Sequence, residues 1–458
     1  MLQISAMKYL AFALQFTAAL TLTAGATHAQ QIRVASRSVI AEGTPTRSFR
    51  EPHVAINPQN GRHLVVATIV PAAGDTFIER SSRQICAAFT SFDGGLMWSR
   101  HDFDVTFCFD PWVVITPDNQ VLVTLLAEHT RFPQQGRAGL LAYHSPDGGR
   151  TWDSAPVGLG TPHDHPTMTL DLSTTPRRGF VYVLSHHPVR DADGARRWSI
   201  FVARSRDGGK TFDDPVNILP NNLHNLAEMP VVLRDGTVVA SFVDASYRTD
   251  RPNGDANDRA FERRRAWIIR STDGGQTFST PVFVNDACGP PPGFRLSALA
   301  ADTSDGPFSG RLYFACRQAG GGRIVVSRAV DGREQWAAPT ALGDQSIVAE
   351  ERIPALATNN RGALVAAWVD GRTAADHHCE EAVYVTSSLD GGASFSPVQR
   401  ISNTEACADS VEVDPTGGDY FGLSAASDGI FRIVWVETRN GVSQLLIASI
   451  DVPGAALR

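Results

Sequence analysis

The chain has 458 residues, 43% of them hydrophobic, and a formal net charge of −7, values typical of a globular protein. This mild acidity argues against a nucleic-acid partner, because such binding needs a basic patch that neutralises phosphates. The 39 glycines and 27 prolines are spread along the chain, which favours many short turns over one long linker.

Residues 1–29 have the features of a secretory signal peptide. Lys8 precedes an apolar run over residues 9–22, and small residues follow as far as Ala29. Met7 offers an alternative start. A membrane anchor is the competing interpretation, but the run is short for a span, and no later segment has about 20 uninterrupted apolar residues. We therefore expect residues 30–458 to form one secreted or periplasmic domain that has no membrane span.

One short pattern recurs along the chain. Its copies, here called the Ser-x-Asp turns, are residues 91–98 (SFDGGLMW), 145–152 (SPDGGRTW), 205–212 (SRDGGKTF), 271–278 (STDGGQTF) and 388–395 (SLDGGASF). A weaker copy surrounds Asp331 and Trp336. Asp-Gly-Gly suits a tight turn, because glycine accepts positive φ and the Asp side chain bonds its own backbone. We interpret these aspartates as structural, not as catalytic or calcium-binding.

The Ser-x-Asp turns resemble the Asp box, or BNR repeat, of the sialidase family. The first four copies begin 54, 60 and 66 residues apart, which suits a four-stranded blade with variable loops. Each copy lies between two β-type runs. The second strand of each unit reads as a continuous apolar run, typical of a strand buried on both faces, at residues 180–184, 238–243, 312–315, 364–369 and 431–436.

These units predict an all-β fold, a seven-bladed β-propeller of four-stranded antiparallel blades. The seventh unit begins near Tyr420 and has only three strands. An N-terminal strand over residues 31–40 would supply the fourth and close the ring, which removes open sheet edges. A six-bladed ring is the alternative.

The six cysteines fit an oxidising compartment. Cys86 and Cys379 open equivalent third strands, and Cys108 and Cys407 precede equivalent first strands. This register predicts the pairs Cys86–Cys108 and Cys379–Cys407, and leaves Cys288–Cys316. Metal ligation is less well supported, because no C-x-x-C spacing occurs.

In a propeller the first strand of each blade lines a central channel, and the Ser-x-Asp turns lie at the opposite end from the start of these strands. Residues just before the first strands should therefore meet at one channel mouth. They are Arg50, Glu51, Asp110, His163, Asp164, His165, Glu228, Arg295, Glu351, Arg352, Asp419 and Tyr420. Such a concentration of ionisable groups suits a polar ligand.

Sialidases carry an F-R-I-P motif whose arginine helps to hold the substrate carboxylate, and residues 49–52 (FREP) resemble it with one substitution. Residues 294–296 (FRL) and 352–354 (RIP) offer two similar settings. The resemblance implies that Arg50, Arg295 and Arg352 bind a carboxylate, since a guanidinium pairs with it bidentately. It further implies Tyr420 as nucleophile, Glu228 as its base and Asp75 as acid/base. A neutral phenol suits an anomeric centre that already bears a carboxylate.

We therefore predict an exo-α-sialidase-like glycosidase that acts with retention, needs no cofactor and works as a monomer on a carbohydrate or glycoconjugate. The alternative is a non-catalytic propeller that binds a glycan or a protein. A third possibility is a carbohydrate-active enzyme that uses two channel carboxylates among Glu51, Asp110, Asp164 and Glu228.

Histidines gather on the same face, with Asp164, Asp376 and Glu380, at His163, His165, His186, His187, His377 and His378. No recognised ligand spacing occurs among them, so we predict no metal.

Overall fold

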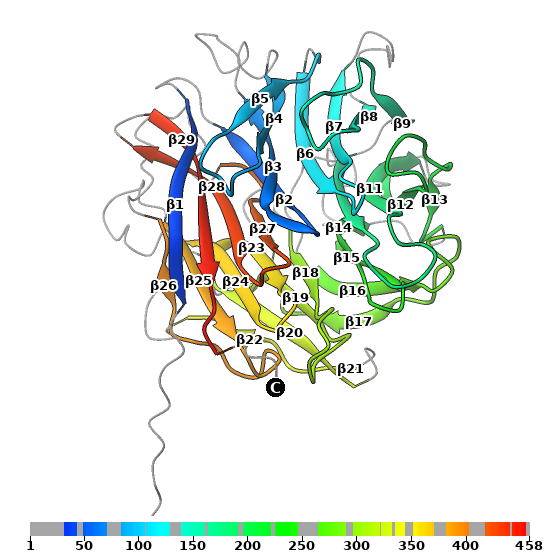
Figure 1. Cartoon of the computed structure of the whole chain (residues 1–458). Helices are drawn as coiled ribbons and strands as arrows, with labels where there is room; N and C mark the ends of the chain where they lie inside the picture. Colours follow the sequence, from blue (N-terminus) through cyan, green and yellow to red (C-terminus); the bar gives the residue numbers. More distant parts are fainter. Residues whose placement is uncertain are drawn as a thin grey trace, which may run out of the picture.

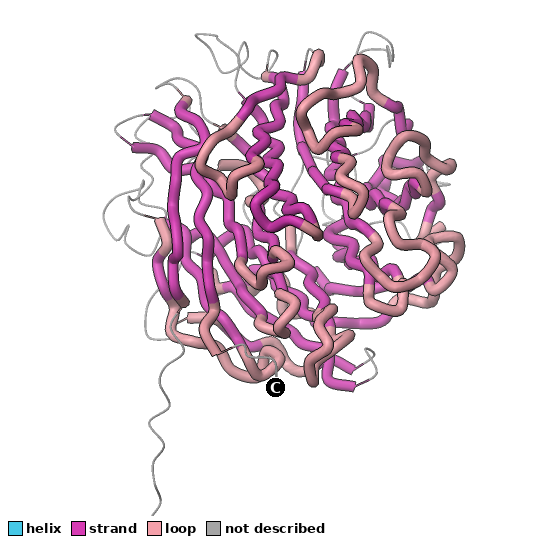
Figure 2. Tube along the Cα trace, viewed as in Figure 1, coloured by secondary structure: helices cyan, strands magenta, loops and turns pink. Residues whose placement is uncertain are grey.

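The computed structural model describes residues 32–43, 49–70, 84–105, 107–128, 139–160, 164–190, 196–220, 225–245, 264–289, 296–320, 322–331, 335–343, 351–370, 382–402, 417–439 and 442–454. These residues form strands and turns and contain no helix (Figure 2). Within them there is accordingly no helix that could cross a membrane. The predicted signal peptide lies outside the described residues.

Seven antiparallel sheets are arranged around a central axis (Figure 1), which confirms the seven-bladed propeller. The first strands of the blades are β2 (Arg50–Asn57), β6 (Phe107–Ile115), β10 (Asp164–Leu170), β14 (Asn225–Val232), β18 (Ala298–Ala301), β23 (Glu351–Thr358) and β27 (Gly422–Ala425). Each of these strands contacts the next, and β27 contacts β2, so that the ring is closed.

The outer strands follow in order within each blade. Second strands are β3 (Asn60–Val70), β7 (Val121–Glu128), β11 (Val181–Arg190), β15 (Val238–Ala245), β19 (Leu312–Arg317), β24 (Leu364–Asp370) and β28 (Phe431–Arg439). Third strands are β4 (Ile85–Ser91), β8 (Gly139–Ser145), β12 (Arg196–Ser205), β16 (Arg264–Ser271), β20 (Ile324–Asp331), β25 (Ala382–Ser388) and β29 (Val442–Asp451). Fourth strands are β5 (Ser99–Asp102), β9 (Val157–Gly160), β13 (Val216–Asn217), β17 (Val282–Asn285), β21 (Gln335–Trp336), β26 (Gln399–Arg400) and β1 (Arg33–Glu42), and β22 (Thr340–Ala341) adds a second partner to β20.

The N-terminal strand closes the ring as predicted. β1 pairs antiparallel with β29, so that the two ends of the chain complete one blade (Figure 1, blue beside red). The apolar second strands lie between neighbouring blades and are buried on both faces. In β3, Leu64, Val65 and Val66 are fully buried, and burying each such side chain contributes about 1.5–3 kcal/mol.

The five Ser-x-Asp turns share one local hydrogen-bond pattern. In the turn at residues 271–278, the Ser271 hydroxyl donates to Asp273 (2.7 Å) and accepts the amide of Gly275 (2.7 Å), while Asp273 Oδ1 accepts the amides of Gln276 and Thr277 (both 3.0 Å). Each turn therefore satisfies its own polar groups, as expected for a structural role.

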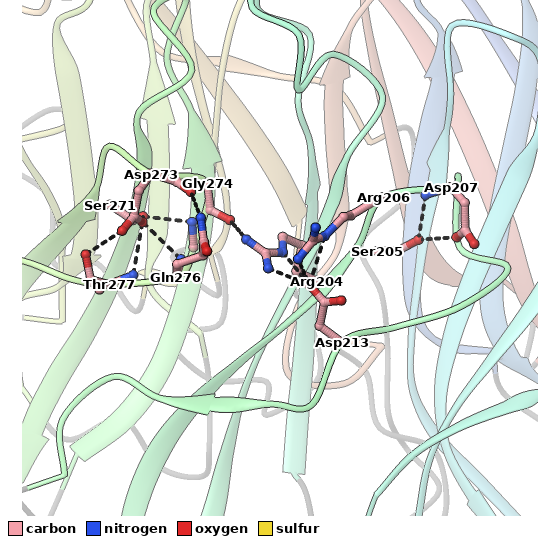
Figure 3. Close-up of polar contacts among 11 residues, drawn as sticks. Arg204, Ser205, Arg206, Asp207, Asp213, Ser271, Asp273, Gly274, Gln276 and Thr277 are labelled. Atoms are coloured by element: carbon pink, nitrogen blue, oxygen red, sulfur yellow. Dashed lines mark hydrogen bonds and ion pairs between the residues drawn. The ribbon is translucent and has the colours of Figure 1, made fainter.

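Side chains also connect one turn to the next, as Figure 3 shows for two neighbouring blades. Arg204 donates to the Gly274 carbonyl (2.5 Å) and to the Asp213 carboxylate (2.7 Å). The Ser-x-Asp turns therefore stabilise the blade ends, both within a blade and between blades.

Two of the predicted disulfides are confirmed. Cys86 bonds to Cys108, joining β4 to β6 of the next blade, and Cys288 bonds to Cys316. The third predicted pair, Cys379–Cys407, lies outside the described residues.

Candidate functional site at the channel mouth

A β-bulge near the start of the first strand recurs in five blades. The pairing of these strands with their second strands skips two residues after Arg50, Phe109, Asp164, Ala227 and Arg352. The first skipped residue in each is Glu51, Asp110, His165, Glu228 and Ile353, and all five are buried. Such a bulge bends the strand and redirects a side chain.

The backbone at these bulges is unusual. Glu51, Asp110 and Ile353 have φ of 50°, and His165 has φ of 46°, although none of them is glycine. Positive φ is costly for a residue with a Cβ, and most of all for a β-branched one. This conformation is therefore imposed by the packing of the blades, and it concentrates ionisable side chains at the mouth.

Six side chains from four blades then form what we call the mouth cluster: Glu51, Asp110, Asp164, His165, His186 and Asp419. His165 Nε2 lies 3.5 Å from Asp419 Oδ2 and 3.9 Å from Asp110 Oδ1. His186 Nε2 lies 3.7 Å from Asp164 Oδ2. The carboxylate of Glu51 accepts the amide of Asp110 (3.2 Å). Of the twelve residues predicted to meet at the mouth, the structure brings Glu51, Asp110, Asp164, His165 and Asp419 together in this cluster.

Burial and mutual repulsion dominate the ionisation of the acidic members. Burial, with added repulsion from Asp110 and Asp419, raises the pKa of Glu51 well above its ordinary value. Burial also raises the pKa of Asp110 to about 6, although the charge of His165 partly opposes the change. For Asp164 burial acts upward, but the charges of His165 and His186 and the hydrogen bond from the His165 amide outweigh it and lower the pKa.

The two histidines respond in opposite directions. Burial acts to lower the pKa of His165, yet the carboxylates of Asp110, Asp164 and Asp419 raise it well above its ordinary value. Burial lowers the pKa of His186, with only partial opposition from Asp164. His165 therefore carries the positive charge that the surrounding carboxylates need, and His186 is neutral.

Glu228 lies at the bulge of β14, beside the mouth cluster. Its carboxylate accepts the amide hydrogen of Ser297 and faces the buried Arg264 of β16. Burial raises the pKa of Glu228 to about 7, and Arg264, Ser297 and His165 offset this only in part. A carboxyl with this pKa can give or take a proton at neutral pH.

Tyr420 is buried at the mouth, next to Trp112 at a ring-centroid distance of 5.2 Å. Its hydroxyl donates to the Pro111 carbonyl (2.8 Å). Burial raises the pKa of Tyr420 well above its ordinary value, and the charges of Glu51, Asp110 and Asp419 raise it further. In this arrangement Tyr420 and Glu228 are each engaged with other partners, so the predicted Tyr–Glu pair stays a prediction.

Of the three predicted carboxylate-binding arginines, two are described. Arg50 begins β2 and Arg352 is the second residue of β23, and both are partly buried at the start of first strands. Arg295 and Asp75 lie outside the described residues. Glu351, also expected at the mouth, instead accepts the amide of Ile324 (2.5 Å) and contacts Arg323 (3.8 Å).

Below the mouth, the channel contains a cavity of about 320 Å³, and residues of all seven first strands, most of them apolar, line it. At its upper part His53 stacks on Trp112 with ring centroids 3.8 Å apart. Burial lowers the pKa of His53 to about 3, and its Nδ1 accepts the amide of Val113 (3.3 Å). The pair is part of the packed wall between mouth and cavity, because Trp112 is buried and its indole N–H donates to the Met168 carbonyl (2.9 Å).

Sequence reasoning missed Arg264. Residues 263–265 are three consecutive arginines before a β-type run. Arg264 is buried against Glu228, whereas Arg265, the next residue on β16, pairs with Asp244 (2.7 Å) and is half-exposed. The two-residue alternation of a strand predicts such a difference, but not which arginine lies against Glu228.

Comparison with known proteins supports the fold and nothing finer. No protein-family model and no curated protein sequence matches the chain. A Dyadobacter fermentans protein of unknown function is similar in structure, with a TM-score of 0.51 at 13% identity over 92% of this chain and 99% of that one.

Sialidases are also among the similar structures. The Hadza microbial sialidase Hz136 gives a TM-score of 0.47 at 13% identity over 92% of this chain and 96% of its own. A Trypanosoma rangeli sialidase gives 0.44 at 13% identity over 93% of this chain and 60% of its own. The fold is a seven-bladed β-propeller, and the activity of the chain has to be argued from its own residues.

Proposed function

We propose that the protein is an exported glycoside hydrolase that resembles exo-sialidases and removes a terminal sugar at the channel mouth. One observation carries the proposal: bulged first strands from different blades bring buried carboxyl groups to the channel mouth, where Tyr420 also lies, above the channel cavity. The disulfides Cys86–Cys108 and Cys288–Cys316 support the export part, because such bonds persist in oxidising compartments.

In the proposed reaction Tyr420 attacks the anomeric carbon of an acidic sugar. The bond from its oxygen to that carbon forms as the glycosidic bond breaks, Asp75 protonates the leaving oxygen, and water later hydrolyses the intermediate. Glu228 takes the phenol proton, while Arg50, Arg295 and Arg352 hold the sugar carboxylate. Because the pKa of Tyr420 is raised, its proton has to leave during the attack, after the hydroxyl exchanges Pro111 for a carboxylate.

A second mechanism is favoured by Glu228. Its pKa of about 7 leaves it largely protonated below neutral pH, and Arg264 stabilises the anion left when the proton goes. These are the properties of a general acid that protonates a leaving oxygen, with an ionised carboxylate of the channel as its partner. Tyr420 would then have a structural role.

The test measures hydrolysis of fluorogenic sialosides and of neutral and acidic aryl glycosides by the mature chain. If Tyr420 is the nucleophile, Tyr420→Phe abolishes turnover of the sialoside. If Glu228 is the acid, Glu228→Gln lowers kcat by about 10²–10⁴-fold for substrates with poor leaving groups. In that case Tyr420→Phe retains activity.

Tyr143→Phe is the matched control, because Tyr143 is also a buried tyrosine that donates to a backbone carbonyl, that of Asp104 (3.2 Å). It should leave turnover unchanged. Absence of turnover across the whole panel would contradict both mechanisms. Glycan binding without turnover, measured by calorimetry, would then establish the non-catalytic alternative.

A further inference from the structure

His186 is a buried histidine with unsatisfied ring nitrogens. It lies on β11, its side chain is 1% exposed, and neither Nδ1 nor Nε2 has a hydrogen-bond partner. Its ring packs edge-on against Trp198, with centroids 4.8 Å apart, which fixes its orientation. Buried polar groups are nearly always satisfied, so an imidazole in this state points to a missing ligand.

Two neighbours complete a set of metal-binding atoms. Asp164 pairs directly with His186 across the β10–β11 ladder, and His165 follows at the bulge. One donor atom from each of Asp164, His165 and His186 lies within 4.8 Å of the others. The two carboxylate oxygens of Asp164 have different neighbours. Oδ1 accepts the amide of His165 (3.1 Å), and Oδ2 faces His186.

The distance between Asp164 Oδ2 and His186 Nε2 is informative. At 3.7 Å it is too long for a hydrogen bond. Two ligands that each lie about 2.0–2.2 Å from a tetrahedral zinc ion are separated by roughly 3.3–3.6 Å. The pair therefore has almost the spacing that a shared cation requires.

The charge around the three residues also suits a cation. The carboxylates of Asp110 and Asp419 lie within 4 Å of His165 Nε2, and Glu51 contacts the backbone of Asp110. With Asp164 they form four acidic groups around two imidazoles. A divalent ion would neutralise them at the point where they converge, and it would displace a ring proton of His165 because it supplies the positive charge in that proton's place.

We propose that Asp164, His165 and His186 bind one divalent first-row transition-metal ion, of the zinc class, at the channel mouth. Two imidazoles and a carboxylate are ligands that suit such ions, and hard cations such as Ca²⁺ prefer all-oxygen sites. Three protein ligands leave a coordination position for water or a sugar hydroxyl. The site stands whether or not the protein hydrolyses glycosides.

The test uses the mature full-length chain after tag removal and chelator treatment. Zn²⁺, Co²⁺ and Ca²⁺ are titrated by calorimetry, bound metal is measured by elemental analysis, and the visible absorption of bound Co²⁺ reports the ligand set. We expect one equivalent of Zn²⁺ or Co²⁺, and at least tenfold weaker binding in His186→Gln and in Asp164→Asn.

Two controls locate the ion. His144→Gln replaces a histidine that lies beside Asp153 (3.1 Å) near a Ser-x-Asp turn, and the double replacement of His377 and His378 removes the other paired histidines of the sequence. Both should keep one equivalent of metal. If a variant of His186 fails to fold by circular dichroism, the Asp164→Asn spectrum decides. Absence of binding to the folded chain, unchanged binding in Asp164→Asn, or preference for Ca²⁺ would overturn the proposal.

Discussion

The two ends of each blade use similar residues in opposite ways. At the Ser-x-Asp end, five turns repeat one set of contacts within eight residues, and the aspartates are held as anions by their own backbone. At the mouth, four blades contribute different residues to the mouth cluster, and carboxyl groups are buried against groups from other blades. The backbone amide of Met97 and the hydroxyl of Ser91 lower the pKa of Asp93, whereas burial raises the pKa of Glu228 to about 7. Hydrogen bonds within a turn therefore favour the charged carboxylate, whereas burial among residues of other blades favours the protonated carboxyl.

The largest effect expected from this comparison is on activity. Glu228→Gln at the mouth should lower glycoside turnover on the order of 10²–10⁴-fold, because it removes a proton-transferring group. Asp273→Asn in a Ser-x-Asp turn should leave turnover of the folded enzyme unchanged. Equal losses in the two variants, measured as kcat on one substrate, would show that the two ends do not differ in this way.

Replacing a glycine at the mouth by alanine should destabilise the fold more than the same replacement of a comparable glycine elsewhere. Gly418 has φ of 105°, and a Cβ there would come within 2.5 Å of Glu51 Cγ and 3.1 Å of its backbone nitrogen. Gly179 has φ of 94° but no atom within 4 Å of that Cβ. Gly418→Ala should therefore cost about 2–4 kcal/mol, and Gly179→Ala about 1–2 kcal/mol, as measured by urea unfolding.

Ionisable groups at the two ends of the blades should change the free energy of unfolding with pH in opposite directions. The folded pKa of Glu228 is raised from 4.5 to about 7, so the folded state holds a proton that the unfolded state releases. Between these values its contribution to stability falls as pH rises, by up to about 1.4 kcal/mol per pH unit. The groups that face it are Arg264 and His165.

Glu228→Gln should flatten the pH dependence of unfolding over this window, measured from pH 4 to pH 8. Asp93, with its lowered pKa, should behave in the opposite way: its contribution is present above 3.8 and is lost as the pH falls further. An Asp93→Asn variant that changes the curve between pH 5 and pH 8 would contradict this separation.

The smallest effect on the free energy of unfolding should come from replacing the serine of a single Ser-x-Asp turn. Ser388 is buried, donates to Asp390 (2.8 Å) and accepts the amide of Gly392 (2.8 Å). Ser388→Ala should cost about 1–2 kcal/mol, because a buried amide loses its acceptor. Ser145→Ala and Ser271→Ala should cost the same within error in thermal and urea unfolding. A wide spread would mean that the turns depend on their neighbours more than their local bonds indicate.

The sequence by itself determined the blades. The Ser-x-Asp turns act within eight residues, and the apolar second strands, such as residues 364–369, are recognisable because burial on both faces leaves an unbroken apolar run. Repetition also placed the closing N-terminal strand and the pair Cys86–Cys108 in register. It even brought Glu51, Asp110, Glu228 and Tyr420 to one end of the channel, since position within a blade fixes height along the axis.

Only the tertiary structure decided which partner each of these residues has. The Pro111 carbonyl, which accepts from Tyr420, and the Glu228 carboxylate, which accepts from Ser297, both lie at bulges, and bulges redirect groups by amounts that no periodicity encodes. His186 sits within a strand that looks like any other, and its burial between Asp164 and Trp198 depends on residues from two further strands. Contacts between distant segments follow from blade packing, and such packing is settled by the whole ring at once.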